Sequence, residues 1–532
     1  MPLVTVQNPI LPGFHPDPCI LRHKDWFYVA TSTFEWWPGV QINRSRDLAS
    51  WEVAGYALTR RSQLDLRGVP DSGGVWAPAL SHADDRFWLI YSDMKSFAGP
   101  AKDVHNYLVT APAITGPWSE PVYLNSSGFD PSLFHDADGH KWLVNQLWKS
   151  STGPDAFDGI VLQEYSVTGQ RLIGAPRRIF AGSALGCTEG PHLYRKDGFY
   201  YLVTAEGGTS WTHAVTVARA RALAGPYELS PHHPLVTSAG DRSLALQKAG
   251  HGSFVQDASG QWYLAHLCAR PVPGTNRCTL GRETALQALD WPKGDWPRLA
   301  DGGHRPRASI SVSGEPARPY FERFHDNFEH ATLSPHWNTL REPASADWLT
   351  LAERPGWLRL RGRFSIQSRF DQSLVGCRVA HHRCDIRTMI DYQPSSPRQR
   401  AGLALFYNTA NFYQLYVSAD EQGVFANVLA CDNGQPREDP GATVRLPDAA
   451  HLELHARLRD QELTFFCCGR DGAARPVGGV FDATTLSDDY PVETGAGWAF
   501  TGLFAVLCAQ DSTGENAPAD FDWFHYEASV PA

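Results

Sequence analysis

Asp25-Trp26-Phe27-Tyr28-Val29 is the first of five short segments in which aromatic and aliphatic residues follow a charged or polar turn. The other four are Arg86-Phe87-Trp88-Leu89-Ile90, His140-Lys141-Trp142-Leu143-Val144, Phe199-Tyr200-Tyr201-Leu202-Val203 and Gln261-Trp262-Tyr263-Leu264-Ala265. Their aligned aromatic residues (Tyr28, Trp88, Trp142, Tyr201 and Tyr263) are 54 to 62 positions apart. A repeat of this length, built from short strands and turns, is typical of β-propeller blades. The sequence therefore predicts five blades.

A second pattern lies 11 or 12 positions before each aligned aromatic residue, where a Pro- or Gly-marked turn leads into the segment. If each segment is the inner hairpin of a blade, these positions begin the innermost strands and converge at one end of the propeller axis. The residues found there are Asp17, Trp76, Asp130, Glu189 and His251. Three carboxylates, an indole and an imidazole in one ring predict a functional site rather than a core.

Ordinary turns are the competing explanation for these acids. Asp before Pro is a common turn former, and Glu189-Gly190-Pro191 is also compatible with a plain loop. For one acid alone the turn explanation is favoured, because short motifs have many chance matches. Turn preferences would place Asp anywhere in a loop, whereas these three acids share one phase of the repeat. The shared phase favours a site.

Beyond about residue 300 the repeat stops. Residues 295 to 320 are rich in Pro, Gly and Arg without strand periodicity, so we expect a linker there. Alternating strands return after Phe324, for example at Trp357–Arg361, Ala401–Tyr407, Phe412–Val417 and Leu452–Arg457. The predicted fold is all-β: a five-bladed propeller over residues 1–315, followed by a β-sandwich of jelly-roll or concanavalin-like type over residues 316–532.

Composition narrows the classes of partner. The formal net charge of −10 argues against nucleic acid and anionic membranes, and an aromatic content of 12% suits a neutral sugar. The sequence has no run of 18 apolar residues, and its first residues lack a basic leader followed by an apolar stretch. The ten cysteines include no C-x-x-C pair, so we interpret them as reduced, mostly buried thiols and expect a cytoplasmic protein.

Several motifs together resemble glycoside hydrolase family 43 β-xylosidases. They are Asn8-Pro9-Ile10-Leu11-Pro12-Gly13-Phe14-His15-Pro16-Asp17-Pro18, Ser32-Thr33-Phe34-Glu35-Trp36-Trp37-Pro38-Gly39-Val40, Gly74-Val75-Trp76-Ala77-Pro78, Gly128-Phe129-Asp130-Pro131-Ser132, Thr188-Glu189-Gly190-Pro191-His192, Gly250-His251-Gly252 and Leu280-Gly281-Arg282-Glu283-Thr284. Thr501-Gly502 and Ala519-Asp520-Phe521-Asp522 extend the resemblance to the family's C-terminal sandwich.

The resemblance implies hydrolysis with inversion at the anomeric carbon. Asp17 would be the general base, Glu189 the general acid, and Asp130 the residue that orients Glu189 and tunes its pKa. This division requires one carboxyl that stays protonated near neutrality and another that stays ionised.

The resemblance also implies a small sugar pocket. Arg282 would hold Asp17 and Asp130 and touch a sugar hydroxyl, and Thr209 is a lesser candidate for a sugar contact. His251 would bind a carboxylate or a water, or lie near a divalent cation such as calcium, although no second ligand stands at regular spacing and no cofactor is required. The candidate apolar walls are Phe34, Trp76 and Trp148 from the propeller, with Phe500 or Phe504 lent by the sandwich.

We therefore expect an exo-acting enzyme that releases xylose from β-1,4-xylo-oligosaccharides. An α-L-arabinofuranosidase or a bifunctional enzyme is the alternative, because both substrates are pentosides. A non-catalytic sugar-binding propeller is disfavoured by the complete set of acid, base and modulator. A retaining fructan hydrolase would carry an Asn-Asp-Pro motif near the N-terminus, which is absent. Association into a homodimer or homotetramer is left open.

Overall fold

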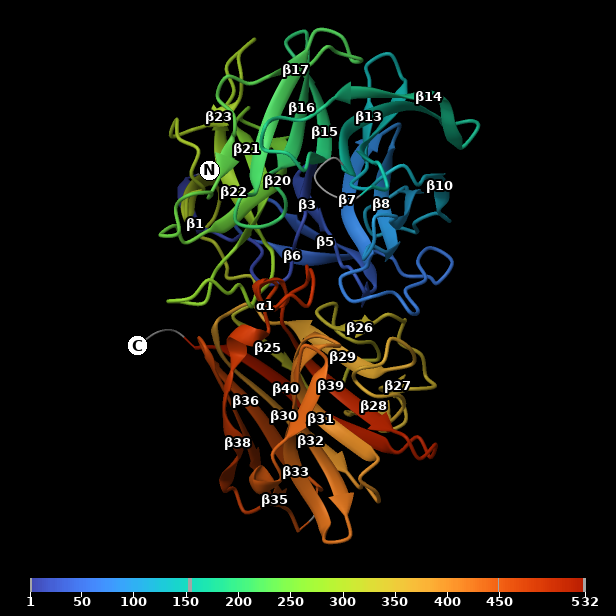
Figure 1. Cartoon of the computed structure of the whole chain (residues 1–532), viewed down its shortest axis with the longest axis vertical. Coiled ribbons are helices and arrows are strands. Elements are labelled where there is room, and N and C mark those ends of the chain that lie inside the picture. Colours follow the sequence, from blue (N-terminus) through green and yellow to red (C-terminus); the bar gives the residue numbers. More distant parts are fainter. Residues whose placement is uncertain (1, 152–155, 448, 530–532) are drawn as a thin grey trace. The chain divides into compact units, whose positions relative to one another are not determined.

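Strands make up almost all of the regular structure in this computed structural model, which describes residues 2–151, 156–447 and 449–529. Within these ranges, α1 (Asp489–Thr494) is the one α-helix. The chain divides in space into two units (Figure 1). Unit 1 comprises Met1–Asp65, Gly73–Arg270 and Arg282–Tyr320, and unit 2 comprises Leu66–Ser72, Pro271–Gly281 and Phe321–Ala532. The residue at which the domain boundary falls stays a prediction.

Unit 1 is a five-bladed β-propeller, as the repeat predicts. In the described part of the chain, five antiparallel sheets follow one another, each with its strands ordered as they occur in the sequence. The innermost strands are β2 (Cys19–His23), β7 (Gly74–Ala83), β11 (Ser132–His135), β15 (Glu189–Lys196) and β20 (Gln247–Gln256). The aligned aromatic segments form the second strands, β3 (Trp26–Thr31), β8 (Arg86–Ser96), β12 (Lys141–Trp148), β16 (Phe199–Glu206) and β21 (Trp262–Ala269).

The outer strands complete each sheet. They are β5 (Gly39–Ser45) and β6 (Glu52–Leu58); β9 (Asp103–Ala111) and β10 (Val122–Asn125); β13 (Phe157–Ser166) and β14 (Arg171–Phe180); β17 (Ala214–Ala220), β18 (Glu228–Leu229) and β19 (Val236–Thr237); and β22 (Glu283–Asp290) and β23 (Arg298–Leu299). The short strand β4 (Trp36–Trp37) comes between β3 and β5 in the sequence only, because β3 and β5 pair directly with each other.

The propeller ring is closed by a strand within the stretch expected to be a linker. β1 (Leu3–Gln7) pairs antiparallel with β24 (Ser309–Ser313), with Leu3 opposite Ser313 and Gln7 opposite Ser309. The prediction of a strand-free linker over residues 295–320 is therefore wrong, because Ser-Ile-Ser-Val-Ser alternates polar and apolar residues and buries Ile310 and Val312.

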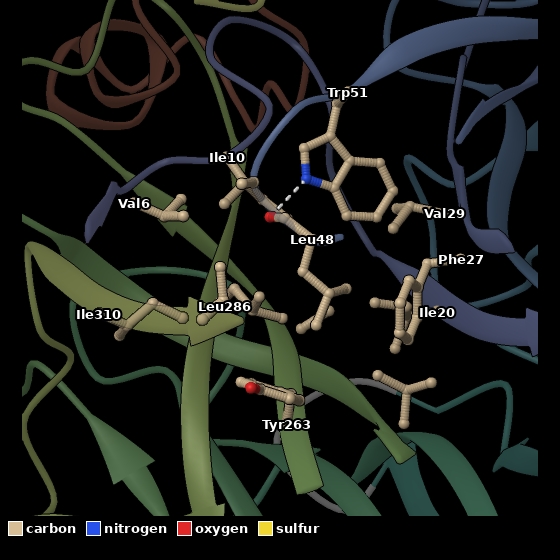
Figure 2. Packing of buried hydrophobic residues seen from close by; sticks show 14 of the residues in the cluster. Val6, Ile10, Ile20, Phe27, Val29, Leu48, Trp51, Tyr263, Leu286 and Ile310 are labelled. Atoms are coloured by element: carbon tan, nitrogen blue, oxygen red, sulfur yellow. Dashed lines mark hydrogen bonds between the residues drawn. The ribbon is translucent and has the colours of Figure 1, made fainter. Parts of the chain in front are cut away.

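Apolar side chains of the first and fifth blades share a core beside this closure (Figure 2). Ile20 and Phe27 from the first blade lie in one cluster with Tyr263 and Leu286 from the fifth. The indole of Trp51, 7% exposed, donates its N–H to the carbonyl of Leu48 at 3.0 Å, which satisfies the polar group inside the cluster. Similar clusters join the second blade to the third, the third to the fourth and the fourth to the fifth.

Unit 2 is a β-sandwich, and the concanavalin-like prediction is confirmed. One sheet runs β27 (Leu349–Thr350), β28 (Leu358–Arg361), β40 (Pro518–Ala528), β30 (Arg383–Tyr392), β36 (Leu452–Arg459), β37 (Glu462–Cys468) and β38 (Ala474–Asp482), with β25 (Arg323–Asp326) also on β40. The other contains β34 (Gln435–Glu438), β33 (Gly423–Asp432), β32 (Asn411–Asp420), β31 (Gln399–Asn408), β39 (Phe504–Asp511), β29 (Ser373–Arg378) and β26 (Asn338–Leu340), with β35 (Val444–Arg445) also on β33.

Candidate active site

Each blade has a backbone bend just before or within its innermost strand. In each blade one residue at this bend has a left-handed backbone: Asp17 (φ 55°), Ala77 (φ 34°), Asp130 (φ 54°), Gly190 (φ 57°) and His251 (φ 39°). The pairing register also shifts at the bends of β7, β15 and β20. Left-handed residues other than Gly each cost of order 1–3 kcal/mol and concentrate at functional sites. Trp76 and Glu189 come directly before such a residue, and the other three predicted ring members are such residues themselves.

Three of these side chains meet within unit 1. Nδ1 of His251 lies 3.9 Å from Oδ1 of Asp17 and 3.9 Å from Oδ2 of Asp130. All three side chains are more than nine-tenths buried. The first, third and fifth blades thus bring two carboxylates and an imidazole together, as the shared phase of the repeat predicts.

Asp17 is held as a carboxylate. Burial by itself would raise its pKa, but the guanidinium of Arg282 and then the neighbouring His251 outweigh it, so the pKa of Asp17 lies below its usual range. Nη1 of Arg282 donates to Oδ1 of Asp17 at 3.3 Å, and the Ser32 hydroxyl donates to Oδ2 at 2.7 Å. A buried carboxylate with two donors, one of them a guanidinium, is suited to accept a proton from water.

Glu189 is held in the opposite state. Burial and then the negative charge of Asp17 raise the pKa of Glu189 to about 8, although Arg282 and Lys102 oppose the shift. Burial, Glu189 and Asp17 also raise the pKa of Asp130 well above its usual value, against the opposing hydrogen bond from the backbone of Gly190. Glu189 therefore retains its proton near neutral pH and is suited to donate it.

Arg282 bonds to two side chains of this site, Asp17 and Thr209. Its side chain is 4% exposed, and Nη1 donates both to Asp17 and to the hydroxyl of Thr209 at 3.0 Å. Its guanidinium carbon lies 5.2 Å from the ring centroid of Phe34. The predicted contact between Arg282 and Asp17 is present, and Thr209 holds the same guanidinium.

An aromatic chain runs beside the carboxylates. Successive ring centroids are 5.6 Å (Phe14 to Phe34), 6.1 Å (Phe34 to Trp76), 5.7 Å (Trp76 to Phe129) and 6.0 Å (Phe129 to Trp148) apart. Phe34 and Phe129 are buried, while Trp76 and Trp148 remain partly exposed. The three predicted wall residues, Phe34, Trp76 and Trp148, therefore belong to one chain of neighbouring rings in unit 1, in which Trp76 and Trp148 keep the exposed surface that a sugar ring can contact.

One ionised and one protonated carboxyl beside aromatic rings are typical of the active site of a glycoside hydrolase. A family model described as "Glycosyl hydrolases family 43" matches residues 6–297, and "Beta xylosidase C-terminal Concanavalin A-like domain" matches residues 325–527. The chain belongs to glycosyl hydrolase family 43.

Relatives of this family 43 chain align over nearly its whole length. It is 46% identical to "Xylosidase/arabinosidase 43B" of Humicola insolens, covering 98% of this chain and 97% of the relative. It is 41% identical to "Xylan 1,3-beta-xylosidase" of a Vibrio species, covering 98% and 99%. The crystal structure of xylan β-1,4-xylosidase from Bacillus halodurans C-125 matches with a TM-score of 0.94 and 48% identity, covering 98% of this chain and 100% of that one.

The sequence reasoning missed Lys102, a lysine whose charge and that of Glu189 influence each other. Its ammonium lies 4.3 Å from the ring centroid of Trp148 and donates to the carbonyl of Phe97 at 3.3 Å. Burial lowers the pKa of Lys102, and the charge of Glu189 opposes this shift. No repeat or motif marks Lys102, whereas two other missed residues, Ser32 and Phe129, lie inside the quoted motifs.

His213 is a second residue that the sequence reasoning missed. It is 1% exposed and its Nδ1 lies 3.2 Å from the carbonyl of Lys248. Burial and then the neighbouring His251 lower the pKa of His213 to about 3, so its imidazole is neutral. A Cβ on Gly250 would lie 2.2 Å from Cγ of His213, which explains the glycine directly before His251.

Within the described ranges His251 belongs to no group of three His, Cys, Asp or Glu residues whose ligand atoms lie within 4.8 Å of one another, and a divalent cation such as calcium near His251 stays a prediction. The group that meets this test is Cys278, Asp488 and Asp489 in unit 2. There Oδ2 of Asp489 accepts the backbone N–H of Cys278 at 3.0 Å, and no catalytic step is assigned to the group.

The two aromatic residues expected from the sandwich differ in exposure. Phe504 is fully buried in β39, with the guanidinium carbon of Arg378 5.5 Å from its ring centroid. The backbone N–H of Phe500 donates to the Ser72 hydroxyl at 2.9 Å, and its ring stacks on that of Trp498 at 6.3 Å. The role of Phe500 or Phe504 as a pocket wall stays a prediction.

Proposed function

We propose that this family 43 chain is an exo-acting, inverting β-xylosidase that releases xylose from the non-reducing end of β-1,4-xylo-oligosaccharides. The observation that carries the proposal is the opposite state of two carboxyls: Arg282 and Ser32 donate to Asp17, whose pKa is lowered, whereas the pKa of Glu189 is raised to about 8. A sugar-binding propeller without activity would need no such pair.

The reaction follows from these protonation states. Asp17 accepts a proton from a water molecule, and the water oxygen forms a bond to the anomeric carbon of the terminal xylose. The bond from that carbon to the glycosidic oxygen breaks, and Glu189 donates its proton to the departing oxygen. Arg282 keeps Asp17 ionised until the water attacks. Water arrives opposite the leaving group, so a β-xyloside yields α-xylose, and room for it requires carboxyls roughly 6.5–9.5 Å apart.

The choice of a xyloside rests on the relatives named above. The Humicola insolens relative is named for xylosidase and arabinosidase activity, which supports arabinofuranosidase side activity as the second candidate. The Bacillus halodurans structure is named for the β-1,4 linkage and the Vibrio relative for the β-1,3 linkage. We favour β-1,4 because the identity to the former is higher.

Cofactor, location and assembly complete the proposal. We propose that the enzyme needs no metal, so that dialysis against EDTA leaves its activity unchanged. A cytoplasmic location agrees with ten free thiols, all within the described ranges. No described helix has the length and apolarity needed to cross a membrane. Light scattering in solution can determine whether the chain assembles into a dimer or a tetramer.

The decisive experiment combines substrate choice and stereochemistry. Initial rates are compared on β-1,4-xylobiose, β-1,3-xylobiose and the nitrophenyl glycosides of β-xylose and α-L-arabinofuranose. Proton NMR of the nitrophenyl β-xyloside reaction in its first minutes should show α-xylose. Initial β-xylose would mean a covalent intermediate, and absence of turnover on every glycoside would favour the sugar-binding alternative.

A further inference from the structure

Glu206 is a carboxylate buried completely beneath the segment that leads to the proposed acid. It is the last residue of β16 and is 0% exposed. Its Oε1 accepts the backbone N–H of Ser183 at 2.8 Å and the hydroxyl of Thr188 at 2.9 Å, while Oε2 accepts the hydroxyl of Ser183. One side chain thus binds both ends of residues 183–188, and Thr188 is the residue directly before Glu189.

Backbone contacts also hold residues 183–188. The N–H of Gly207 donates to the carbonyl of Gly186 at 2.8 Å, in the middle of residues 183–188. Gly182 packs so closely that a Cβ there would lie 2.0 Å from the hydroxyl oxygen of Thr188. The segment before Glu189 is therefore held by side-chain and main-chain bonds that converge on Glu206 and Gly207.

Glu283 has the corresponding place beneath the segment that leads to the proposed base. It is 0% exposed and accepts the backbone N–H of Gly13 at 2.7 Å. Arg270 donates to both of its oxygens, at 2.6 and 2.8 Å. The next residue, Thr284, donates its hydroxyl to the carbonyl of His15 at 2.6 Å, two residues before Asp17.

Each of the two carboxylates is bonded to one lead-in segment, Glu206 to residues 183–188 and Glu283 to Gly13. We propose that Glu206 and Glu283 are separate positioning residues, Glu206 for the acid Glu189 and Glu283 for the base Asp17. This inference rests on the proposed function, because it uses the roles assigned there to both carboxyls. A misplacement of about 1 Å can cost about 100-fold in rate. Glu206 is therefore placed to control protonation of the leaving group, and Glu283 to control activation of the water.

Substrates with different leaving groups distinguish the role of Glu206 from that of Glu283. A nitrophenol departs with little protonation, whereas the sugar leaving group of xylobiose needs a proton from the acid. Displacement of the acid therefore slows xylobiose hydrolysis far more than nitrophenyl xyloside hydrolysis. Displacement of the base slows both alike, since water must be activated in either case.

The variants Glu206→Gln and Glu283→Gln test this difference, and each is the matched control of the other. We expect Glu206→Gln to lose about 100-fold in kcat/KM on xylobiose and only a few-fold on nitrophenyl xyloside. Glu283→Gln should lose similar factors on both substrates. If either Gln variant fails to fold, Thr188→Val and Thr284→Val replace them. Each removes one hydroxyl that holds a lead-in segment, and the two should show the same difference between substrates with smaller losses of kcat/KM.

Glu189→Ala and Asp17→Ala serve as references for the two profiles. If Glu189→Ala shows no dependence on the leaving group, the assigned roles fail and the inference fails with them. If the references behave as assigned but the Glu206 and Thr188 variants lose equally on both substrates, or lose nothing, the positioning role of Glu206 is overturned. Leaving-group dependence in the Glu283 and Thr284 variants would overturn the role of Glu283.

Discussion

The imidazole of His251 lies directly against the backbone of Gly190, the residue that follows Glu189. A Cβ built on Gly190 would stand 2.9 Å from Cε1 and 3.0 Å from Nδ1 of that ring. The same imidazole nitrogen lies 3.9 Å from the carboxylates of Asp17 and Asp130. His251 therefore spaces the strand that begins with the acid from the carboxylates of two other blades.

Gly190→Ala should reduce kcat/KM on xylobiose at least about tenfold, because the methyl group displaces either the imidazole or Glu189. Gly174→Ala is the matched control, since Gly174 also has a positive φ (70°) but a Cβ there meets nothing within 4 Å. Kinetics of the two variants, with circular dichroism to verify folding, separate contact with His251 from backbone strain. Equal losses in both variants would assign the effect to strain alone.

Removal of the proposed acid and base should have different consequences. Glu189→Ala is expected to lose about 100-fold or more on xylobiose and to retain much of its rate on nitrophenyl xyloside, because general acid catalysis contributes factors of about 10²–10⁴. Asp17→Ala should lose activity on both substrates. Steady-state rates over a series of aryl xylosides measure this difference, and parallel losses in both variants would contradict the assignment.

The pH dependence should follow the protonation of Glu189. Its pKa is raised to about 8 and only its protonated form can donate, so kcat/KM should fall as pH rises through about 8. Lys102 lowers that pKa. Lys102→Met should therefore raise it and move the alkaline limb to higher pH. Lys149→Met, which removes a surface lysine paired with Asp158, should leave the limb in place, and an unmoved limb in Lys102→Met would exclude the charge effect.

Ser32→Ala should affect the acidic limb instead. The Ser32 hydroxyl stabilises the ionised form of Asp17, so its removal raises the pKa of Asp17 and moves the acidic limb to higher pH. The maximal rate should fall about tenfold, in line with loss of one hydrogen bond to a charged group. Ser45→Ala, another buried serine, which donates to Asp47, is the control. A shift confined to the alkaline limb would show that Ser32 acts elsewhere.

Periodicity was enough to predict the blades and the residues that converge on their axis. Asp17, Asp130 and His251 were found by counting back from the aromatic anchors, and the structure brings the imidazole of His251 within 4 Å of both carboxylates. Counting works because a propeller repeats one sheet about an axis, so equal phase in the sequence means equal place in the blade.

Residues without a repeat or a motif could not be found this way. Lys102 reaches Glu189 from the loop before β9, and only the folded chain shows that the two charges influence each other. The sequence argument expected Asp130 to tune Glu189, while the largest causes in the structure are burial and then Asp17. Burial depends on packing from all sides, which no local pattern encodes.

The pairing of β1 with β24 affects how the chain folds during its synthesis on the ribosome. Leu3 finds its partner only when Ser313 has been made, roughly 15–60 s later at the usual rates of about 5–20 residues per second. During that interval the apolar side chains of Ile20 and Phe27, which later contact the fifth blade, have no cover from it. The nascent chain is therefore most exposed to aggregation and to chaperones before its last blade emerges.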